Sequence, residues 1–145
     1  MSGAWILDSE ALSLYLRADR KMTARLAAAL EDDIRVVISA ATIVEVDHDK
    51  VHFARLAWTL SRLTVEPLTK NLARRASDLL KSAGLQGHKY AIDAMVAATA
   101  TAVSDKPVTI LTSDRDDMEK ILGEFLDRSS LECDADRSEV KVFPV

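Results

Sequence analysis

The chain has 145 residues, of which 48% are hydrophobic and 29% are charged. This composition supports an apolar core and excludes an intrinsically disordered chain. The formal net charge of −4 does not indicate a nucleic-acid-binding protein, because such proteins usually carry an excess of Lys and Arg.

The apolar pattern alternates between short β-type runs and longer runs with helical spacing. In chain order we expect a strand at 4–7, helices at 9–16 and 21–31, a strand at 35–39, a helix from about Thr42, a helix at 49–63, a strand at 63–68, a helix that carries Leu72 to Ala83 and stops at Gly84, a helix at 89–104, a strand at 108–111, a helix at 114–126 and a strand at 140–143. A polar stretch at 128–138 precedes the last strand.

Strands that alternate with helices predict an α/β fold with a mostly parallel central sheet. Right-handed crossovers between parallel strands place helices on both faces of that sheet, which gives a three-layer α/β/α arrangement. We expect about five strands and a single domain over residues 1–145, because no linker or repeat interrupts the pattern. In open sheets of this kind, ligands bind beyond the carboxyl ends of the strands.

A single cysteine, Cys133, excludes a disulfide within one chain and a zinc cluster built on cysteine. It suits a reducing compartment, and we expect a cytoplasmic protein. The N-terminal residues lack the basic and apolar regions of a signal peptide, and no run approaches the roughly 18 apolar residues of a membrane helix. We therefore expect no membrane association.

Four acidic residues stand out in the predicted α/β pattern: Asp8, Glu45, Asp93 and Asp114. Asp8 and Asp114 follow predicted strands, and Glu45 lies on the helix after the second strand. Asp93 lies inside a predicted helix among apolar neighbours, where an unpaired carboxylate is costly. A divalent metal ion would compensate that cost if the other acids converge on it. Without metal the carboxylates would repel one another, and at least one pKa should rise.

Helix capping is an alternative explanation for three of these acids. Asp8 can cap the helix that follows it. The spacings Thr42–Glu45, Ser113–Asp116 and Asp114–Asp117 each fit a capping box. Asp93 differs, because it sits in a helix interior and caps nothing.

The histidines, glycines and aromatic residues indicate no further functional site by their spacing or number. The histidines, His48, His52 and His88, lack the spacing of a helical zinc site, and the glycines do not form a phosphate-binding loop. The apolar stripe from Phe53 to Leu63 is more typical of a core than of an interface. Two basic groups are candidate RNA contacts or ordinary solvated helix faces; they are Arg17, Arg20, Lys21 and Arg25, and Arg74, Arg75, Lys81, His88 and Lys89. With 5% aromatic residues, a base-stacking platform is not evident.

Four stretches carry a resemblance to a known family. They are Ile6–Leu12 (ILDSEAL), Ile38–Val46 (ISAATIVEV), Ile92–Ala100 (IDAMVAATA) and Leu111–Met118 (LTSDRDDM). Their residues, order and spacing resemble those of a PIN domain, specifically a VapC-type toxin ribonuclease, over essentially the whole chain. Glu10 departs from the pattern, since the family usually has a small or hydroxyl residue there, and Asp47 and Asp49 add acids near Glu45.

The resemblance implies a PIN-like fold and a Mg²⁺- or Mn²⁺-dependent endoribonuclease whose metal site is formed by Asp8, Glu45, Asp93 and Asp114. It also implies that Asp117 is an additional ligand and that Thr112, or Ser113 beside it, orients a water. The implied partners are the RNA substrate, a cognate VapB-type antitoxin and a second copy of the chain in a homodimer.

Carboxylates suit this chemistry because Mg²⁺ and Mn²⁺ are hard cations that prefer oxygen ligands. Metal-assisted hydrolysis does not use the RNA 2′-hydroxyl, so we expect products with a 5′-phosphate and a 3′-hydroxyl. Three alternatives stay open: a PIN nuclease that processes RNA as a housekeeping enzyme, a PIN fold that binds RNA without cutting it, and a receiver-like binding module. The receiver-like module needs a lysine at the end of a late strand, and the only candidate, Lys106, precedes its strand.

Overall fold

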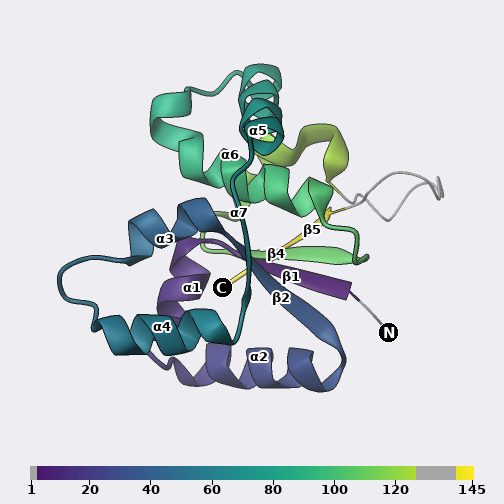
Figure 1. Cartoon of the computed structure of the whole chain (residues 1–145). Coiled ribbons are helices and arrows are strands. Elements are labelled where there is room, and N and C mark those ends of the chain that lie inside the picture. Colours follow the sequence, from purple (N-terminus) through teal and green to yellow (C-terminus); the bar gives the residue numbers. More distant parts are fainter. Residues whose placement is uncertain (1–2, 127–139) are drawn as a thin grey trace.

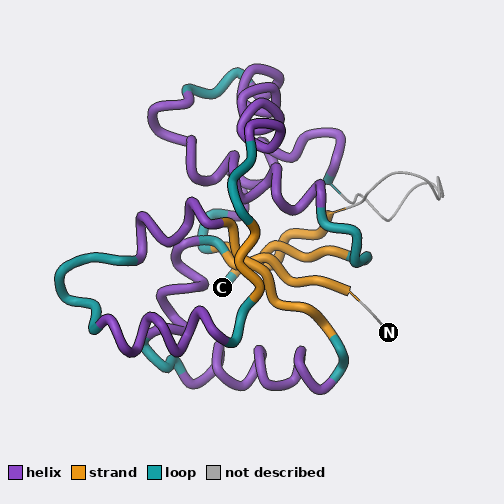
Figure 2. Tube along the Cα trace, in the orientation of Figure 1, coloured by secondary structure: helices purple, strands orange, loops and turns teal. Residues whose placement is uncertain are grey.

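Five parallel strands form the central sheet of the computed structural model, which describes residues 3–126 and 140–145. The strands are β1 (Gly3–Leu7), β2 (Ile34–Ser39), β3 (Thr64–Glu66), β4 (Val108–Thr112) and β5 (Val140–Pro144). They lie in the order β3-β2-β1-β4-β5, and all four pairings are parallel. The prediction of an α/β fold with about five strands is confirmed, and the described sheet is parallel throughout (Figure 2).

Helices cover both faces of the sheet (Figure 1). They are α1 (Ser9–Leu16), α2 (Arg20–Glu31), α3 (Ala40–Val46), α4 (Phe53–Ser61), α5 (Lys70–Ala83), α6 (Gly87–Ala102) and α7 (Arg115–Leu122), followed by a short 3₁₀ helix at Gly123–Phe125. Helices α5, α6 and α7 lie on one side of the sheet, and α1, α2 and α4 lie on the other.

The strands alternate their side chains between two separate cores, as expected for a buried sheet. In β1, Ala4 and Ile6 pack toward α5, α6 and α7, whereas Leu7 packs toward α1 and α2. In β4, Ile110 joins the first core and Leu111 joins the second. The three-layer prediction is therefore confirmed by the distribution of buried side chains.

Local hydrogen bonds set the helix boundaries that the periodicity placed inaccurately. Helix α4 begins at Phe53 instead of residue 49, because the His52 side chain caps it by accepting the backbone N–H of Ala54. Helix α7 ends at Leu122, since Gly123 takes a positive φ of 54° that breaks the helix. Gly84 ends α5 in a left-handed conformation, as predicted.

The strand order creates a switch point between β1 and β4. From β1 the chain moves to β2 and β3 on one side, and it then returns to β4 on the other side of β1. Ligand sites of open parallel sheets lie beyond the carboxyl ends of the two strands at such a point. Asp8 follows β1, and Thr112 ends β4.

None of the helices in residues 3–126 has the length and apolar character that a membrane crossing requires. Cys133 and the predicted polar stretch at 128–138 lie outside the described residues.

Candidate metal centre

Asp8 is the most firmly held acid at the switch point. It caps α1, with its Oδ1 accepting the backbone N–H of Ala11 at 2.8 Å. Its Oδ2 accepts the backbone N–H of Ser113 at 3.2 Å, and the Thr112 side chain adds a further hydrogen bond. The residue is only 5% exposed, and this burial raises the pKa of Asp8 in spite of the hydrogen bonds. Asp8 is therefore fixed between the ends of β1 and β4.

Thr112 connects Asp8 with the beginning of α7. Its side chain is fully buried, and its Oγ1 accepts the backbone N–H of Asp114 at 3.0 Å. The backbone N–H of Asp8 also bonds to the carbonyl of Leu111 at 3.1 Å, which continues the pairing of β1 with β4. These contacts hold the 112–114 turn against Asp8 and place Asp114 on the same edge of the sheet.

The pKa of Asp93 is affected by the charges of the other acids in the cluster. Burial raises the pKa of Asp93 to about 6, with further contributions from the negative charges of Asp8, Glu45, Asp114 and Asp117. Repulsion of this kind acts between groups that lie near one another. Acids from the end of β1, from α3 and from the beginning of α7 are therefore close enough to Asp93 to raise its pKa, which is in the direction expected for neighbouring carboxylates without a metal.

The remaining acids lie at the rim of the cluster. Glu45 is exposed on the last turn of α3, and its Oε1 accepts the Ser9 hydroxyl at 2.7 Å. Asp114 and Asp117 lie at the beginning of α7. Local desolvation, together with a hydrogen bond and charge repulsion from Asp114, raises the pKa of Asp117.

Capping explains only one of the three acids for which it was an alternative. Asp8 does cap its helix. Helix α3 is capped by Ser39, so the predicted Thr42–Glu45 capping box is wrong, and the Thr42 hydroxyl is buried without a hydrogen-bond partner. Asp114 precedes α7 but makes no side-chain capping bond, so the capping boxes predicted there are wrong as well. Glu45 and Asp114 therefore have no capping role.

The five clustered acids, Asp8, Glu45, Asp93, Asp114 and Asp117, offer the carboxylate oxygens that hard divalent cations prefer. In the described part of the chain, the ion pairs within 4.0 Å use other carboxylates, namely those of Glu10, Glu66, Asp105 and Glu119. Among the described residues the five clustered acids thus make no ion pair within 4.0 Å, and their oxygens are the ligand type that Mg²⁺ and Mn²⁺ prefer. In this conformation, however, no three acidic, histidine or cysteine side chains within residues 3–126 and 140–145 form a closed metal-binding group.

Lys89 is one of two lysines, with Lys120, whose positive charge acts on Asp117. A hydrogen bond with Tyr90 and the negative charges of Asp117 and Asp114 raise the pKa of Lys89. Its Nζ lies 5.1 Å from the centre of the Tyr90 ring, and the side chain is exposed one turn before Asp93 on α6. Lys89 is therefore available to a ligand at the edge of the acidic cluster.

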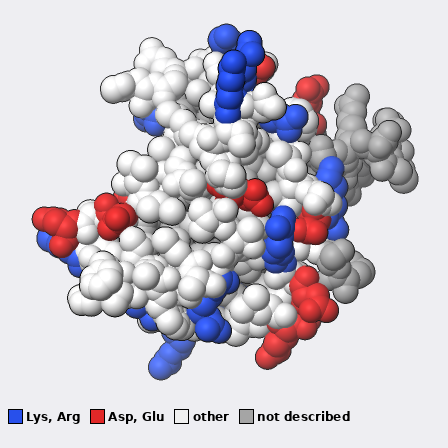
Figure 3. All heavy atoms as spheres, viewed as in Figure 1, with Lys and Arg blue, Asp and Glu red and all other residues white. Residues whose placement is uncertain are grey.

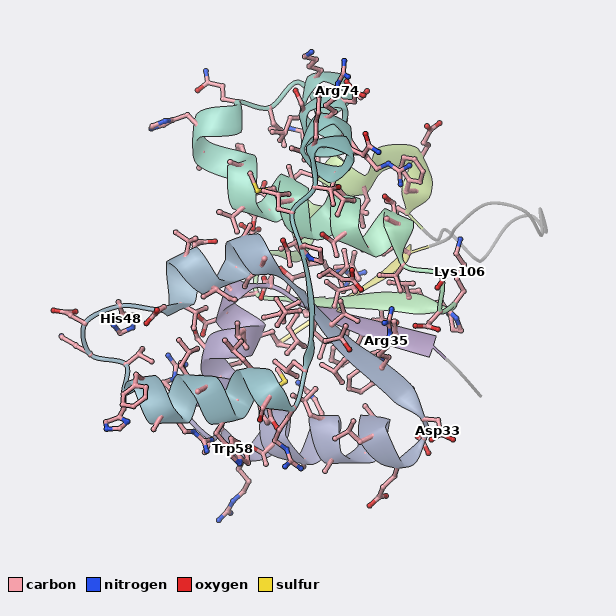
Figure 4. The ribbon with its side chains drawn as sticks, in the orientation of Figure 1. Asp33, Arg35, His48, Trp58, Arg74 and Lys106 are labelled. Carbon is pink, nitrogen blue, oxygen red and sulfur yellow. The ribbon has the colours of Figure 1, made fainter. Side chains whose placement is uncertain are left out.

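Several other candidates from the sequence have local structural roles. Glu10 points its carboxylate to Arg17 at 3.4 Å on the exposed side of α1. His48 and His52 each accept a backbone N–H two residues later, and Figure 4 shows His48 in the connection between α3 and α4. Lys106, labelled in Figure 4, precedes β4 at the end of the sheet where the strands begin, whereas Asp8 follows the carboxyl end of β1, so Lys106 offers no receiver-like lysine.

Two surface cavities lie away from the acidic cluster. One of about 530 Å³ lies between α5 and the end of α7, lined by Leu79, Ile121 and Phe125 among others. A second, of about 480 Å³, lies at the opposite end of the sheet beside Trp5 and Pro107. Neither cavity is lined by Asp8, Glu45, Asp93, Asp114 or Asp117.

Comparison with known proteins identifies the protein family of the chain. The family model for the PIN domain matches residues 5–122, and the chain belongs to this family. Two of the solved structures that share the fold are those of VapBC2 and FitAB. VapBC2 from Rickettsia felis, bound to a DNA fragment from its promoter, is 13% identical with a TM-score of 0.63, over 97% of this chain and 98% of that chain. FitAB bound to the IR36 DNA fragment is 20% identical with a TM-score of 0.59, over 97% of this chain and 94% of that chain. No curated protein matched the chain significantly.

Proposed function

We propose that this PIN domain is a metal-dependent endoribonuclease and the toxin of a VapBC-type toxin–antitoxin pair. The observation that carries the proposal is the group of acids around Asp93 at the carboxyl edge of the sheet. These acids are the residues that the PIN resemblance assigns to metal binding: Asp8, Glu45, Asp93 and Asp114, with Asp117 beside them. Membership of the PIN family supports nuclease activity as the use of that group.

The metal would be Mg²⁺ or Mn²⁺, which when bound would supply Lewis acidity to a water and to the phosphate. Asp8 holds its position through its backbone hydrogen bonds, so it provides a rigid ligand. Asp93 and Glu45 approach from α6 and α3, and Asp114 from α7. The full burial of Thr112 favours a role in holding the 112–114 turn, which leaves the exposed Ser113 as the hydroxyl able to contact water.

RNA binding depends on local rather than global charge. Lys and Arg are interspersed with Asp and Glu over the face shown in Figure 3, without a continuous basic surface. We assign Lys89 as a phosphate contact, because it is exposed beside the acids that would otherwise repel the RNA backbone.

The proposed partners are a VapB-type antitoxin and a second copy of the chain. Large apolar side chains remain exposed on α3 and α4, with Val44 at 76% and Phe53 at 79% exposure. Phe53 was predicted to lie in a core stripe, and that part of the prediction is wrong, although Leu56 of the same stripe is buried. We therefore place the proposed protein interface in the region of α3 and α4, where these apolar side chains are exposed.

Two experiments test the proposal. The purified protein is incubated with end-labelled RNA and Mn²⁺ or EDTA, and we expect cleavage with Mn²⁺ only, giving 5′-phosphate and 3′-hydroxyl ends. Products with 2′,3′-cyclic phosphate ends would contradict the metal-assisted mechanism. Expression in bacteria then separates the toxin from a housekeeping nuclease: a toxin arrests growth, and co-expression of the small protein encoded beside it relieves the arrest.

A further inference from the structure

One hydrogen bond joins two parts of the acidic cluster that are distant in sequence. The Ser9 hydroxyl donates to Glu45 Oε1 at 2.7 Å, across 36 positions of the chain. Ser9 is the first residue of α1, and Glu45 lies in the last turn of α3. The bond exists because α1 and α3 pack against each other at the carboxyl edge of the sheet.

Glu45 needs such support more than Asp8 does. Asp8 accepts hydrogen bonds from Ala11, Ser113 and Thr112, which leave it little freedom. Glu45 has a longer side chain with more rotamers, it is exposed, and within the described residues Ser9 is the group that donates a hydrogen bond to it. Ordering a free Glu side chain costs conformational entropy at the moment a ligand binds. A hydroxyl that already holds one carboxylate oxygen reduces that cost.

We propose that Ser9 is a positioning residue, which holds the Glu45 carboxylate in the orientation needed to bind a divalent cation together with Asp8 and Asp93. This inference rests on the proposed function, since it concerns the same site. Ser9 contacts Glu45 through its hydroxyl and acts only through that carboxylate. Ligating carboxylates are commonly held by hydrogen bonds from neighbouring groups, whose loss lowers metal affinity or activity by about 10–100-fold.

The beginning of α1 therefore sets the positions of two carboxylates: that of Asp8 itself, and that of Glu45 through the Ser9 hydroxyl. Asp8 caps α1 with its own side chain, and Ser9 directs its hydroxyl to the neighbouring helix α3. Glu10, the next residue, bonds to Arg17 on the exposed side of α1 and takes no part. Any change that moves the beginning of α1 would displace both the Asp8 and the Glu45 carboxylates.

The test compares Ser9→Ala and Ser9→Thr with wild type, with Ser13→Ala as a matched control on the same helix. Mn²⁺ affinity is measured without RNA, from the Mn²⁺ concentration at half of the maximal rise in melting temperature. We expect Ser9→Ala to weaken Mn²⁺ binding by about 10–100-fold, Ser9→Thr to restore it by retaining the hydroxyl, and Ser13→Ala to leave it unchanged. RNA cleavage at a fixed low Mn²⁺ concentration should follow the same order.

A second comparison isolates the route through Glu45. In a Glu45→Gln background, Ser9→Ala should cause no further loss of Mn²⁺ affinity, because the group through which Ser9 acts is already changed. Equal Mn²⁺ affinity of Ser9→Ala and wild type would overturn the inference, as would a full additional loss in the Glu45→Gln background. If wild type itself neither binds Mn²⁺ nor cleaves RNA, the proposed function fails, and this outcome is distinct from a failure of the Ser9 assignment.

Discussion

Replacing Asp93 by Asn should stabilise the metal-free protein while it removes metal binding. The folded protein raises the pKa of Asp93 from 3.8 to about 6, so ionisation of this carboxyl opposes folding. At a pH where Asp93 is ionised in both the folded and the unfolded chain, a pKa rise of this size lowers the free energy of unfolding by about 3 kcal/mol. Asp93 is only half-buried, so solvent screening reduces this to about 1–2 kcal/mol. For a chain of this size, that gain raises Tm by roughly 3–6 °C.

The pH dependence has a definite sign. Between about pH 4 and 6 the folded protein holds a proton on Asp93 that the unfolded chain has released, so wild type loses stability as pH rises through this window. The neutral amide of the Asp93→Asn variant does not titrate, so the variant has no such loss. The stability difference between Asp93→Asn and wild type should therefore be largest above pH 6 and should vanish below about pH 4.

Urea unfolding with EDTA at pH 7.5 and at pH 4 measures this difference directly. Asp116→Asn is the matched control, because Asp116 is an exposed acid in the first turn of α7, and its replacement should leave stability nearly unchanged or slightly lower. If Asp93→Asn is less stable than wild type at pH 7.5 in EDTA, the reasoning from burial and charge repulsion is refuted.

Three further outcomes follow from the same site. Mn²⁺ at 100 times its Kd should stabilise wild type by about 2.7 kcal/mol and Asp93→Asn far less, as measured by thermal melts. Equal stabilisation of the two proteins would exclude Asp93 as a metal ligand. In urea unfolding of the metal-free protein, Asp8→Ala should be less stable than Asp8→Asn by about 1–2 kcal/mol, because Asn retains the α1 cap without the buried charge, and equal stability of the two variants would contradict that role. Lys89→Gln should raise the KM for RNA and reduce its salt dependence with little change in kcat, and an unaltered KM would exclude Lys89 as a phosphate contact.

Much of the fold follows from short-range patterns in the sequence. The β-branched and apolar runs at 35–39 and 108–111 are too short for helices, and both lie in strands of the described sheet. Asp8 and Asp114 could be placed near the carboxyl ends of strands because that position depends only on the strand–helix alternation. The helix termini were less predictable, since the cap at His52 depends on a side-chain nitrogen that composition does not reveal.

The details of the candidate site depend on contacts that spacing along the chain cannot supply. Spacing alone made Thr42–Glu45 a capping box, whereas the packed structure uses Ser39 as the cap and leaves Glu45 to accept a hydrogen bond from Ser9. That bond requires α1 and α3 to pack together, so it was outside the reach of local patterns. Asp93 lies in a helix interior, so the sequence already excluded a capping role for it. In the structure, the charges of Asp8, Glu45, Asp114 and Asp117 all raise its pKa.

Cleavage of RNA by wild type and by Asp93→Asn, each with Mn²⁺, tests the central claim most directly. Asp116→Asn serves as the control for loss of a nearby acid outside the proposed ligand set. The account predicts that wild type and Asp116→Asn cut the RNA, that EDTA stops both, and that Asp93→Asn is inactive although it is folded and at least as stable. Equal cleavage by Asp93→Asn and wild type would contradict the account.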